Sequence, residues 1–326
     1  MVEEKREFDV FKLHDSKDSI LKLMRAYSVS SKFFRTDACK NQINNSFMKL
    51  LQKIDVKLKK ELGLQWRLVW KEKLYFNPSK SAMNDWLIGR ATIPLSALEV
   101  LTEFSCVDEV KQIKKTLTHV CGSRGGPIFV PKQLTSEMAF LVGAILGDGH
   151  LGDRTVSFEL TDEELIQKIT AIANKLFQTD FAHKKRIRLI RPNRKNSFTL
   201  YLDSKVITRF FNKFFEIPIG KKSDIIIVPS LIKSSSKEIQ EAFLAGIFET
   251  DGCETKKEFT ITTASEQFCN ELYELIKGFG VPVHTSFWLN KVYHKKYYRV
   301  HFSKKLVISV SGCTELETRL DLDSRA

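Results

Sequence analysis

A ten-residue stretch occurs twice in this chain, and this repeat constrains the fold more than any other feature. The stretch FLVGAILGDG covers residues 140–149, and FLAGIFETDG covers residues 243–252, which begins 103 residues later. Each copy is an apolar run with small residues near its start and an Asp-Gly pair at its end. Because an internal repeat indicates a duplicated structural unit, the chain is expected to contain two similar halves.

The composition of each copy predicts a buried helix that packs closely against its counterpart. Small residues at positions 143–144 and 245–246 allow two helix backbones to approach each other. The glycine after each acid is expected to end its helix as a left-handed C-cap. Two such helices lying side by side would bring Asp148 and Asp251 together at the same end.

Two adjacent carboxylates at helix C-termini predict a cation site. Like charges repel, and the helix dipole disfavours negative charge at this end. A hard divalent cation removes both penalties, and an oxygen-rich site suits Mg2+ or Mn2+. Asp148 and Asp251 are therefore candidate catalytic residues and metal ligands, and the preceding residues Gly147 and Thr250 are candidate ligands beside them.

The sequences LVGAILGDG and LAGIFETDG resemble the paired motifs of the LAGLIDADG homing endonucleases. The first copy departs from the family pattern at position six, where Leu146 replaces the commoner acid, whereas the second copy has Glu249 there. The resemblance implies that Asp148 and Asp251, at position eight, hold the catalytic metal. It also implies cleavage of both strands of a long, asymmetric DNA target across the minor groove. Two unlike halves in one chain suit such a target, so a monomer is expected.

The same series of elements is predicted after each motif. Apolar periodicity and turn residues indicate a strand at 155–160, a helix at 163–177, a hairpin around 192–193 and a helix at 205–215. After the second motif they indicate a strand at 258–263, a helix at 267–279 and a hairpin at 283–302. The predicted fold class is therefore α+β, with tandem pseudo-two-fold αββαββα repeats preceded by a mostly helical domain.

A run of glycine and proline, CGSRGGP at residues 121–127, predicts a domain boundary. The domains expected from it are a helical domain at 1–120, a linker at 121–134, a first repeat at 135–236, a second repeat at 237–310, and a tail of unusual, non-native composition at 311–326. In the first domain, apolar residues at helical spacing predict helices from about residue 16 to 62, with Gly63 ending the last of them.

One stretch of the first domain, WLIGRATIPLSALEVL at residues 86–101, resembles the DNA-reading part of helix-turn-helix regulators. Such modules place one helix in the major groove of DNA. The polar residues then expected to face DNA are Lys80, Ser81, Asn84 and Arg90. A small helical bundle that makes no DNA contact is the alternative.

Basic residues are concentrated in the two predicted hairpins. The chain has 52 lysine and arginine residues against 39 acids, for a formal charge of +13. Residues 183–195 contain seven lysines and arginines, residues 291–305 contain six, and neither segment contains an acid. Alternation along a strand places such side chains on one face, and a basic β-ribbon fits the DNA major groove. A merely solvated surface is the alternative. The predicted contacts to double-stranded DNA are Lys184, Lys185, Arg186, Arg188, Arg191, Arg194, Lys195, Tyr201, Lys291, Lys295, Lys296, Arg299 and His301.

The turn IGKKS at residues 219–223 is similar to the Gly-x-Lys-Ser turn that supplies a catalytic lysine in intein-type LAGLIDADG enzymes. The resemblance makes Lys222 the candidate catalytic lysine, with Lys221 as the fallback. Its ammonium group would stabilise charge or tune the attacking water near the scissile phosphate. No matching turn follows the second repeat.

Several functional classes are disfavoured. Cysteines and histidines lack the spacing of zinc sites, and this disfavours a histidine-metal nuclease. No apolar run approaches the roughly 20 residues of a membrane span, and no signal-peptide pattern is visible, so a cytoplasmic, nucleoid-associated protein is expected. Two alternatives to the endonuclease remain: a DNA-binding regulator that keeps the repeat without cutting, and a maturase that binds intron RNA.

Overall fold

The computed structural model describes residues 8–13, 24–26, 39–63, 79–87, 93–122, 127–186, 197–291 and 294–306. These residues fall into two compact units. The first unit lies within Glu7–Lys132 and Ser204–Arg209, and the second lies within Gln133–Asp203 and from Phe210 onward. None of the helices described is long and apolar enough to cross a lipid bilayer.

The first unit combines helices with a small antiparallel sheet of strand order β2-β1-β3-β4. Its helices bury an apolar face that includes Leu51, Ile54 and Trp86. Its elements are the 3-10 helix η1 (Val10–Leu13), β1 (Met24–Ala26), α1 (Cys39–Leu62), α3 (Lys80–Leu87), β2 (Ile93–Pro94), α4 (Leu95–Glu103), α5 (Val107–Thr116), β3 (His119–Gly122) and β4 (Pro127–Phe129).

The first unit departs from the sequence prediction at β1. Helical spacing of apolar residues predicts a helix there, but Arg25 pairs with Pro94 on one side and with Cys121 on the other. Pairing with two strands that are distant in the sequence outweighs the local periodicity. Gly63 does end α1, with a left-handed φ of 56°. Within the segment 121–134, the end of β3 and the whole of β4 are strands that pair with each other.

The second unit contains the order αββαββ twice, which confirms the predicted fold class. The first copy consists of α6 (Ser136–Leu146), β5 (His150–Leu151), β6 (Val156–Leu160), α7 (Glu163–Phe177), β7 (His183–Arg186) and β8 (Ser197–Leu202). It is followed by α8 (Lys205–Phe215), whose residues are divided between the two units at Phe210. The short α9 (Ser230–Lys233) precedes the second copy, which consists of α10 (Lys237–Asp251), β9 (Gly252–Glu254), β10 (Phe259–Thr263), α11 (Glu266–Lys277), β11 (Val283–Asn290) and β12 (Lys295–Phe302), followed by the 3-10 helix η4 (Lys304–Leu306).

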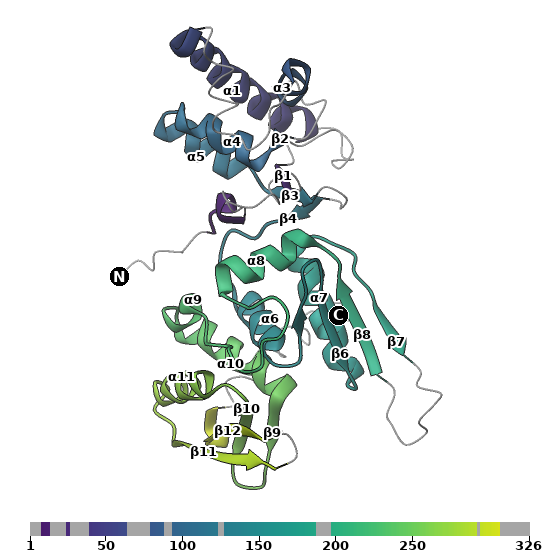
Figure 1. Cartoon of the computed structure of the whole chain (residues 1–326), viewed down its shortest axis with the longest axis vertical. Coiled ribbons are helices and arrows are strands. Elements are labelled where there is room, and N and C mark those ends of the chain that lie inside the picture. Colours follow the sequence, from purple (N-terminus) through teal and green to yellow (C-terminus); the bar gives the residue numbers. More distant parts are fainter. Residues whose placement is uncertain are drawn as a thin grey trace, which may run out of the picture. The chain divides into compact units, whose positions relative to one another are not determined.

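The two repeats share their sheet topology as well as their element order. The strand orders are β5-β6-β8-β7 and β9-β10-β12-β11, and every pairing is antiparallel. Helix α7 packs on the first sheet and α11 on the second, while α6 and α10 pack against each other (Figure 1). The motif helices therefore join the two halves of the unit.

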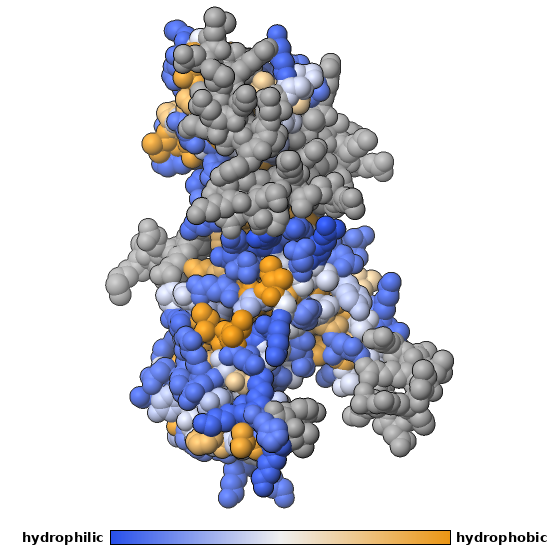
Figure 2. All heavy atoms as spheres, viewed as in Figure 1, coloured by the Kyte–Doolittle hydropathy of each residue, from blue (hydrophilic) through white to orange (hydrophobic). Residues whose placement is uncertain are grey.

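Alternation along the strands gives each sheet an apolar face and a polar face. In the second sheet Val300 and Phe302 are buried, and Arg299 and His301, which alternate with them, point to the opposite side. Aromatic rings fill the apolar side, where Phe248 and Phe259 lie 4.7 Å apart between centroids. Hydrophilic residues cover most of the visible surface of this unit, with small hydrophobic groups between them (Figure 2).

Candidate active site and nucleic-acid interface

The motif helices α6 and α10 touch through their backbones, as the small residues predict. A Cβ added to Gly143 would overlap the carbonyl oxygen of Phe243, and a Cβ added to Gly246 would overlap the carbonyl oxygen of Phe140. The two contacts are reciprocal, so each helix contributes one glycine and one carbonyl. This close approach fixes the ends of the two helices relative to each other.

The glycines that follow the acids have a different role from the one predicted. The sequence predicts left-handed C-caps at Gly149 and Gly252, but neither has a positive φ, and Gly252 has a φ of −79°. A Cβ on Gly149 would lie 2.6 Å from the Cα of Ile145, and one on Gly252 would overlap Phe248. Glycine is required here because the chain turns back against its own helix, and not because of a left-handed conformation.

The carboxylates of Asp148 and Asp251 lie at the same end of this helix pair. Both side chains are open to solvent on one side, while the surrounding helices remove part of their hydration. This desolvation raises the pKa of Asp148, and together with the charge of Asp148 it raises the pKa of Asp251 to about 6. The positive charge of Lys222 opposes both shifts. The two halves of the repeat thus meet at a pair of destabilised negative charges.

Lys222 is held at the end of α6, next to both acids. Its ammonium group donates to the carbonyl oxygens of Ile145, Leu146 and Gly147 at 2.7, 2.5 and 2.7 Å. These are carbonyls of the last helical turn, which lack partners within a helix. Burial lowers the pKa of Lys222 to about 8, and Asp251 and Asp148 act against that shift.

The neighbouring candidates Gly147 and Thr250 contact each other across the helix pair. A Cβ on Gly147 would overlap the hydroxyl of Thr250 and would lie 3.5 Å from Oδ2 of Asp251. The Thr250 hydroxyl donates to the carbonyl oxygens of Gly246 and Ile247, both at 3.0 Å. The Thr250 side chain therefore turns back onto its own helix, and Gly147 offers a main-chain oxygen beside the acids.

The predicted DNA contacts of the first repeat divide between two faces of its sheet. Lys184 pairs with Thr199 and shares a face with the exposed Tyr201. Lys185 pairs with Phe198 on the opposite, apolar face, and its ammonium group lies 5.6 Å from the centre of that ring. Lys184 and Lys185 therefore lie on opposite faces, because successive side chains of a strand point to opposite sides, and the role of each in DNA binding stays a prediction.

The second repeat shows the same division. Lys295, Arg299 and His301 share the polar face, whereas Lys296 pairs with Leu289 on the other face, 5.2 Å from the ring of Phe287. The guanidinium of Arg299 stacks on Trp288 at 4.6 Å and its Nε donates to Thr262. Lys296 and Arg299 therefore lie on opposite faces, and their roles in DNA binding stay predictions. Lys291 lies at the hairpin turn.

Acids from other elements balance part of the basic charge in the second hairpin. Lys295 forms an ion pair with Asp224, and Lys304 forms one with Glu254 at 2.6 Å. His301 hydrogen-bonds Glu258 at 2.8 Å. A sequence window without acids therefore overstates the free positive charge of this strand.

The other predicted contacts have varied placements. Lys80, Ser81 and Asn84 are exposed on α3, and their role in DNA binding stays a prediction. Arg186 belongs to β7. The remaining predicted residues, Arg90, Arg188, Arg191, Arg194 and Lys195, lie outside the described residues.

The structure also gathers one group that the sequence did not reveal. Glu258, His284 and His301 meet on the polar face of the second sheet. Spacing rules for metal ligands look for nearby residues on one element, whereas His284 comes from β11, His301 from β12 and Glu258 from the residue before β10. Hairpin register is the signal that could have found them, because a hairpin from Val283 to Phe302 sets His284 opposite His301.

Comparisons with known proteins agree with this arrangement. Residues 238–310 match the model of the LAGLIDADG-like domain. One component of the A-type ATP synthase from Pyrococcus abyssi is 30% identical over 160 residues, which is 48% of this chain and 15% of that protein. A replication factor C small subunit from Methanocaldococcus jannaschii is 28% identical over 196 residues, which is 60% of this chain and 10% of that protein.

The chain thus spans 10–15% of the length of these two curated relatives. Among solved structures, the homing endonuclease I-DmoI in complex with DNA and Mn is 19% identical with a TM-score of 0.39, covering 55% of this chain and 96% of that one. The matched domain contains the second motif, and the first motif repeats it within the same order of elements. Residues 238–310 thus match a LAGLIDADG-like domain, and residues 136–202 repeat its order of elements.

Proposed function

We propose that this chain is a site-specific, metal-dependent DNA endonuclease of the homing type, which hydrolyses phosphodiester bonds in both strands of a long, asymmetric duplex target. The observation that carries the proposal is the meeting of Asp148 and Asp251 at one end of the α6–α10 pair, beside Lys222. Each half of the repeat supplies one acid. A pseudo-symmetric pair of acids suits a reaction that is carried out once on each strand.

The donor set fits a hard divalent cation such as Mg2+ or Mn2+. Two carboxylates lie close enough for the charge of Asp148 to raise the pKa of Asp251, and the carbonyl of Gly147 adds a main-chain oxygen nearby. Carboxylate and carbonyl oxygens are the ligands that such ions prefer. When bound, the ion supplies Lewis-acid stabilisation of charge on the phosphate and activates water.

The residues of this chain have separable roles in that reaction. Asp148 and Asp251 would hold the cation between the two halves, and the raised pKa of Asp251, about 6, means that protons would compete with the cation at mildly acidic pH. Lys222 keeps an ammonium group beside them through its three carbonyl contacts. In that position its positive charge stabilises the negative charge that develops on the phosphate.

The polar faces of the two sheets form the DNA-binding surface in this proposal. Lys184 and Tyr201 contribute from the first sheet, and Arg299 and His301 contribute from the second. Basic side chains bind phosphates, and arginine also reads guanine in the major groove. Because the two sheets carry different side chains, one chain can read an asymmetric site without a second copy.

Cleavage of a plasmid library carrying randomised duplex inserts tests the proposal. The wild-type chain is expected to linearise a subset of plasmids in Mg2+ and not in EDTA, and sequencing of the ends then gives the target. The Asp148→Asn, Asp251→Asn double variant is expected to bind the same target without cutting it. If the wild type binds duplex DNA and leaves it intact, the regulator takes the place of the endonuclease, and if structured intron RNA outcompetes duplex DNA, the maturase does.

A further inference from the structure

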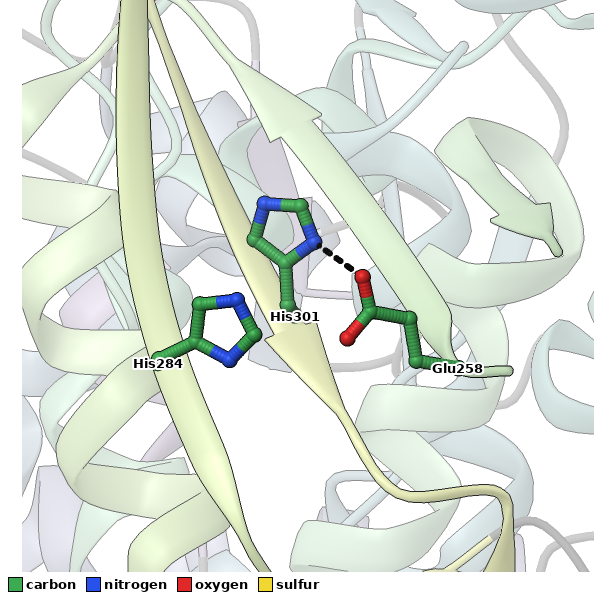
Figure 3. Close-up of side chains that lie close together, drawn as sticks. All are labelled: Glu258, His284 and His301. Atoms are coloured by element: carbon green, nitrogen blue, oxygen red, sulfur yellow. Dashed lines mark hydrogen bonds and ion pairs between the residues drawn. The ribbon is translucent and has the colours of Figure 1, made fainter.

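We propose that Glu258, His284 and His301 form a binding site for a divalent first-row transition metal ion of the Zn2+ type (Figure 3). The site lies on the polar face of the second sheet. It goes beyond the endonuclease proposal, because none of its residues belongs to the acid pair at the end of the motif helices. It is built from strand pairing and not from a short sequence motif.

The antiparallel register brings the three side chains together. His284 on β11 pairs directly with His301 on β12, and their rings stack with centroids 4.5 Å apart and planes 3° apart. Glu258 reaches the same point from the residue before β10, with Oε1 2.8 Å from Nδ1 of His301. One ligand atom from each of the three residues lies within 4.8 Å of the other two.

This spacing is close to what a metal ion requires. Nitrogen and oxygen ligands lie about 2.0–2.2 Å from zinc in a tetrahedral site, so two of them are about 3.3–3.4 Å apart. The Glu258 oxygen and the His301 nitrogen, now 2.8 Å apart, would separate by only about half an ångström to admit an ion. The exposed His284 side chain can turn its ring edge toward the same point without disturbing the core.

A further residue is already placed to orient the central ligand. The hydroxyl of Ser286 lies 2.8 Å from Nε2 of His301, on the side of the ring away from Glu258. Histidines that bind metal through one ring nitrogen usually have the other one hydrogen-bonded, which fixes the tautomer and the ring orientation. The His301 side chain is only 12% exposed, so its position is set before any ion arrives.

The ligand set selects a different ion from the acid pair. Two imidazoles and one carboxylate suit Zn2+, Co2+ or Ni2+, whereas Mg2+ prefers oxygen ligands alone. Three protein ligands leave one position of a tetrahedral site to water. A bound ion would tie β11 and β12 to the start of β10, and it would add positive charge to the face that carries Arg299.

Calorimetric titration of the metal-free full chain with Zn2+ tests this site, and the visible spectrum of added Co2+ reports its coordination. The titration uses the Asp148→Asn, Asp251→Asn background as well as the wild type, so that the acid pair cannot supply the binding. The informative variants are His284→Ala and Glu258→Gln. The matched control is Thr285→Ala, because Thr285 is exposed next to His284 on the opposite face of β11.

We expect one equivalent of Zn2+ to bind at this site in the acid-pair background, with or without Thr285→Ala, and a tetrahedral Co2+ spectrum in each case. His284→Ala and Glu258→Gln should lose that binding, and Ser286→Ala should weaken it by about 10-fold or more. Equal Zn2+ binding by the wild type and His284→Ala would overturn the proposal, as would loss of the binding in the acid-pair background. Cleavage of DNA in Mg2+ is measured separately on the wild type, so the endonuclease proposal stands or falls independently of the Zn2+ result.

Discussion

Gly143 and Gly246 face each other across the contact between α6 and α10, and neither position has room for a side chain. A Cβ at either would overlap a carbonyl oxygen of the opposite helix, and it would lie 2.9 Å from a backbone nitrogen there. These atoms are backbone, so they cannot move aside as the end of a flexible side chain can. The placement of the two acids depends on this contact.

Gly246→Ala is therefore expected to destabilise the chain even though alanine is the better helix former. Helix propensity favours alanine over glycine by up to about 1 kcal/mol, but separating two packed helices to make room for the methyl group costs on the order of 2–3 kcal/mol. A fall in melting temperature of about 4–12 °C follows for a domain of this size. Thermal denaturation checks the prediction, and an unchanged or higher melting temperature would contradict the backbone contact.

The acid pair gives stability a pH dependence of defined sign. Folding raises the pKa of Asp251 to about 6 from a usual value of 3.8, so the folded state binds its proton more tightly than the unfolded state does. Protonated Asp251 therefore contributes to the free energy of unfolding, and this contribution is fully present below pH 3.8 and is lost as pH rises through about 6. In the metal-free protein at pH 8, the ionised pair therefore weakens the fold.

Asp251→Asn should then stabilise the metal-free protein at pH 8 and have little effect near pH 4. After allowance for solvent screening the gain is on the order of 1 kcal/mol, or about 2–4 °C in melting temperature. Denaturation in EDTA at the two pH values measures it. Added Mg2+ should reverse the order at pH 8 by stabilising only the wild type. A variant less stable than the wild type in EDTA at pH 8 would argue against a destabilised acid pair.

Lys222 and Lys221 are adjacent lysines with different surroundings, and substituting methionine for each separates their roles. Lys222→Met removes the donor to three carbonyls at the end of α6, whereas Lys221 is exposed. Removing the buried charge of Lys222 would by itself stabilise the fold, since burial disfavours that charge and lowers the pKa of Lys222 to about 8. The loss of three hydrogen bonds outweighs it, so Lys222→Met should cost about 1–3 kcal/mol and Lys221→Met almost nothing. Denaturant titration of both variants decides this.

Lys184 and Lys185 provide a test of the DNA-binding face, because they are neighbours on opposite sides of one strand. The slope of log affinity against log salt falls by about 0.9 for each phosphate that the protein no longer neutralises. Lys184→Ala should reduce the slope by about that amount, and Lys185→Ala should leave it unchanged. Fluorescence anisotropy with a labelled duplex at several salt concentrations measures both. Equal effects of the two substitutions would show that the polar face is not the binding surface.

The sequence predicts the repeat and its elements well because both rest on local patterns. The bounds of α7 and α8 coincide with the predicted ranges 163–177 and 205–215, since apolar periodicity is strong in each. The meeting of Asp148 and Asp251 also follows from local signals, namely the small residues inside each helix and the acid at its end. Each of these features is signalled by the local sequence.

The differences from the sequence predictions arise where a distant partner decides the outcome. Met24–Ala26 form a strand because β2 and β3 flank them, and no local pattern reveals those partners. Charge runs cannot show that Asp224 comes from another element to pair with Lys295. Proximity in sequence groups Lys185 and Lys296 with their basic neighbours, whereas strand register assigns them to the opposite face. The histidine cluster likewise depends on register and has no local signal.

Cleavage of the target recovered from the plasmid library, measured as an initial rate against Mg2+ concentration, tests the central claim most directly. The comparison covers the wild type, the single variants Asp148→Asn and Asp251→Asn, and the control Glu249→Gln. Glu249 lies in the second motif with Asp251, but its carboxylate pairs with Lys168 at 2.8 Å. We predict metal-dependent cutting of both strands by the wild type and Glu249→Gln, and a rate at least about 100-fold lower for each Asp variant at equal DNA affinity. Undiminished cutting by Asp148→Asn and Asp251→Asn would contradict the assignment of the active site to this pair.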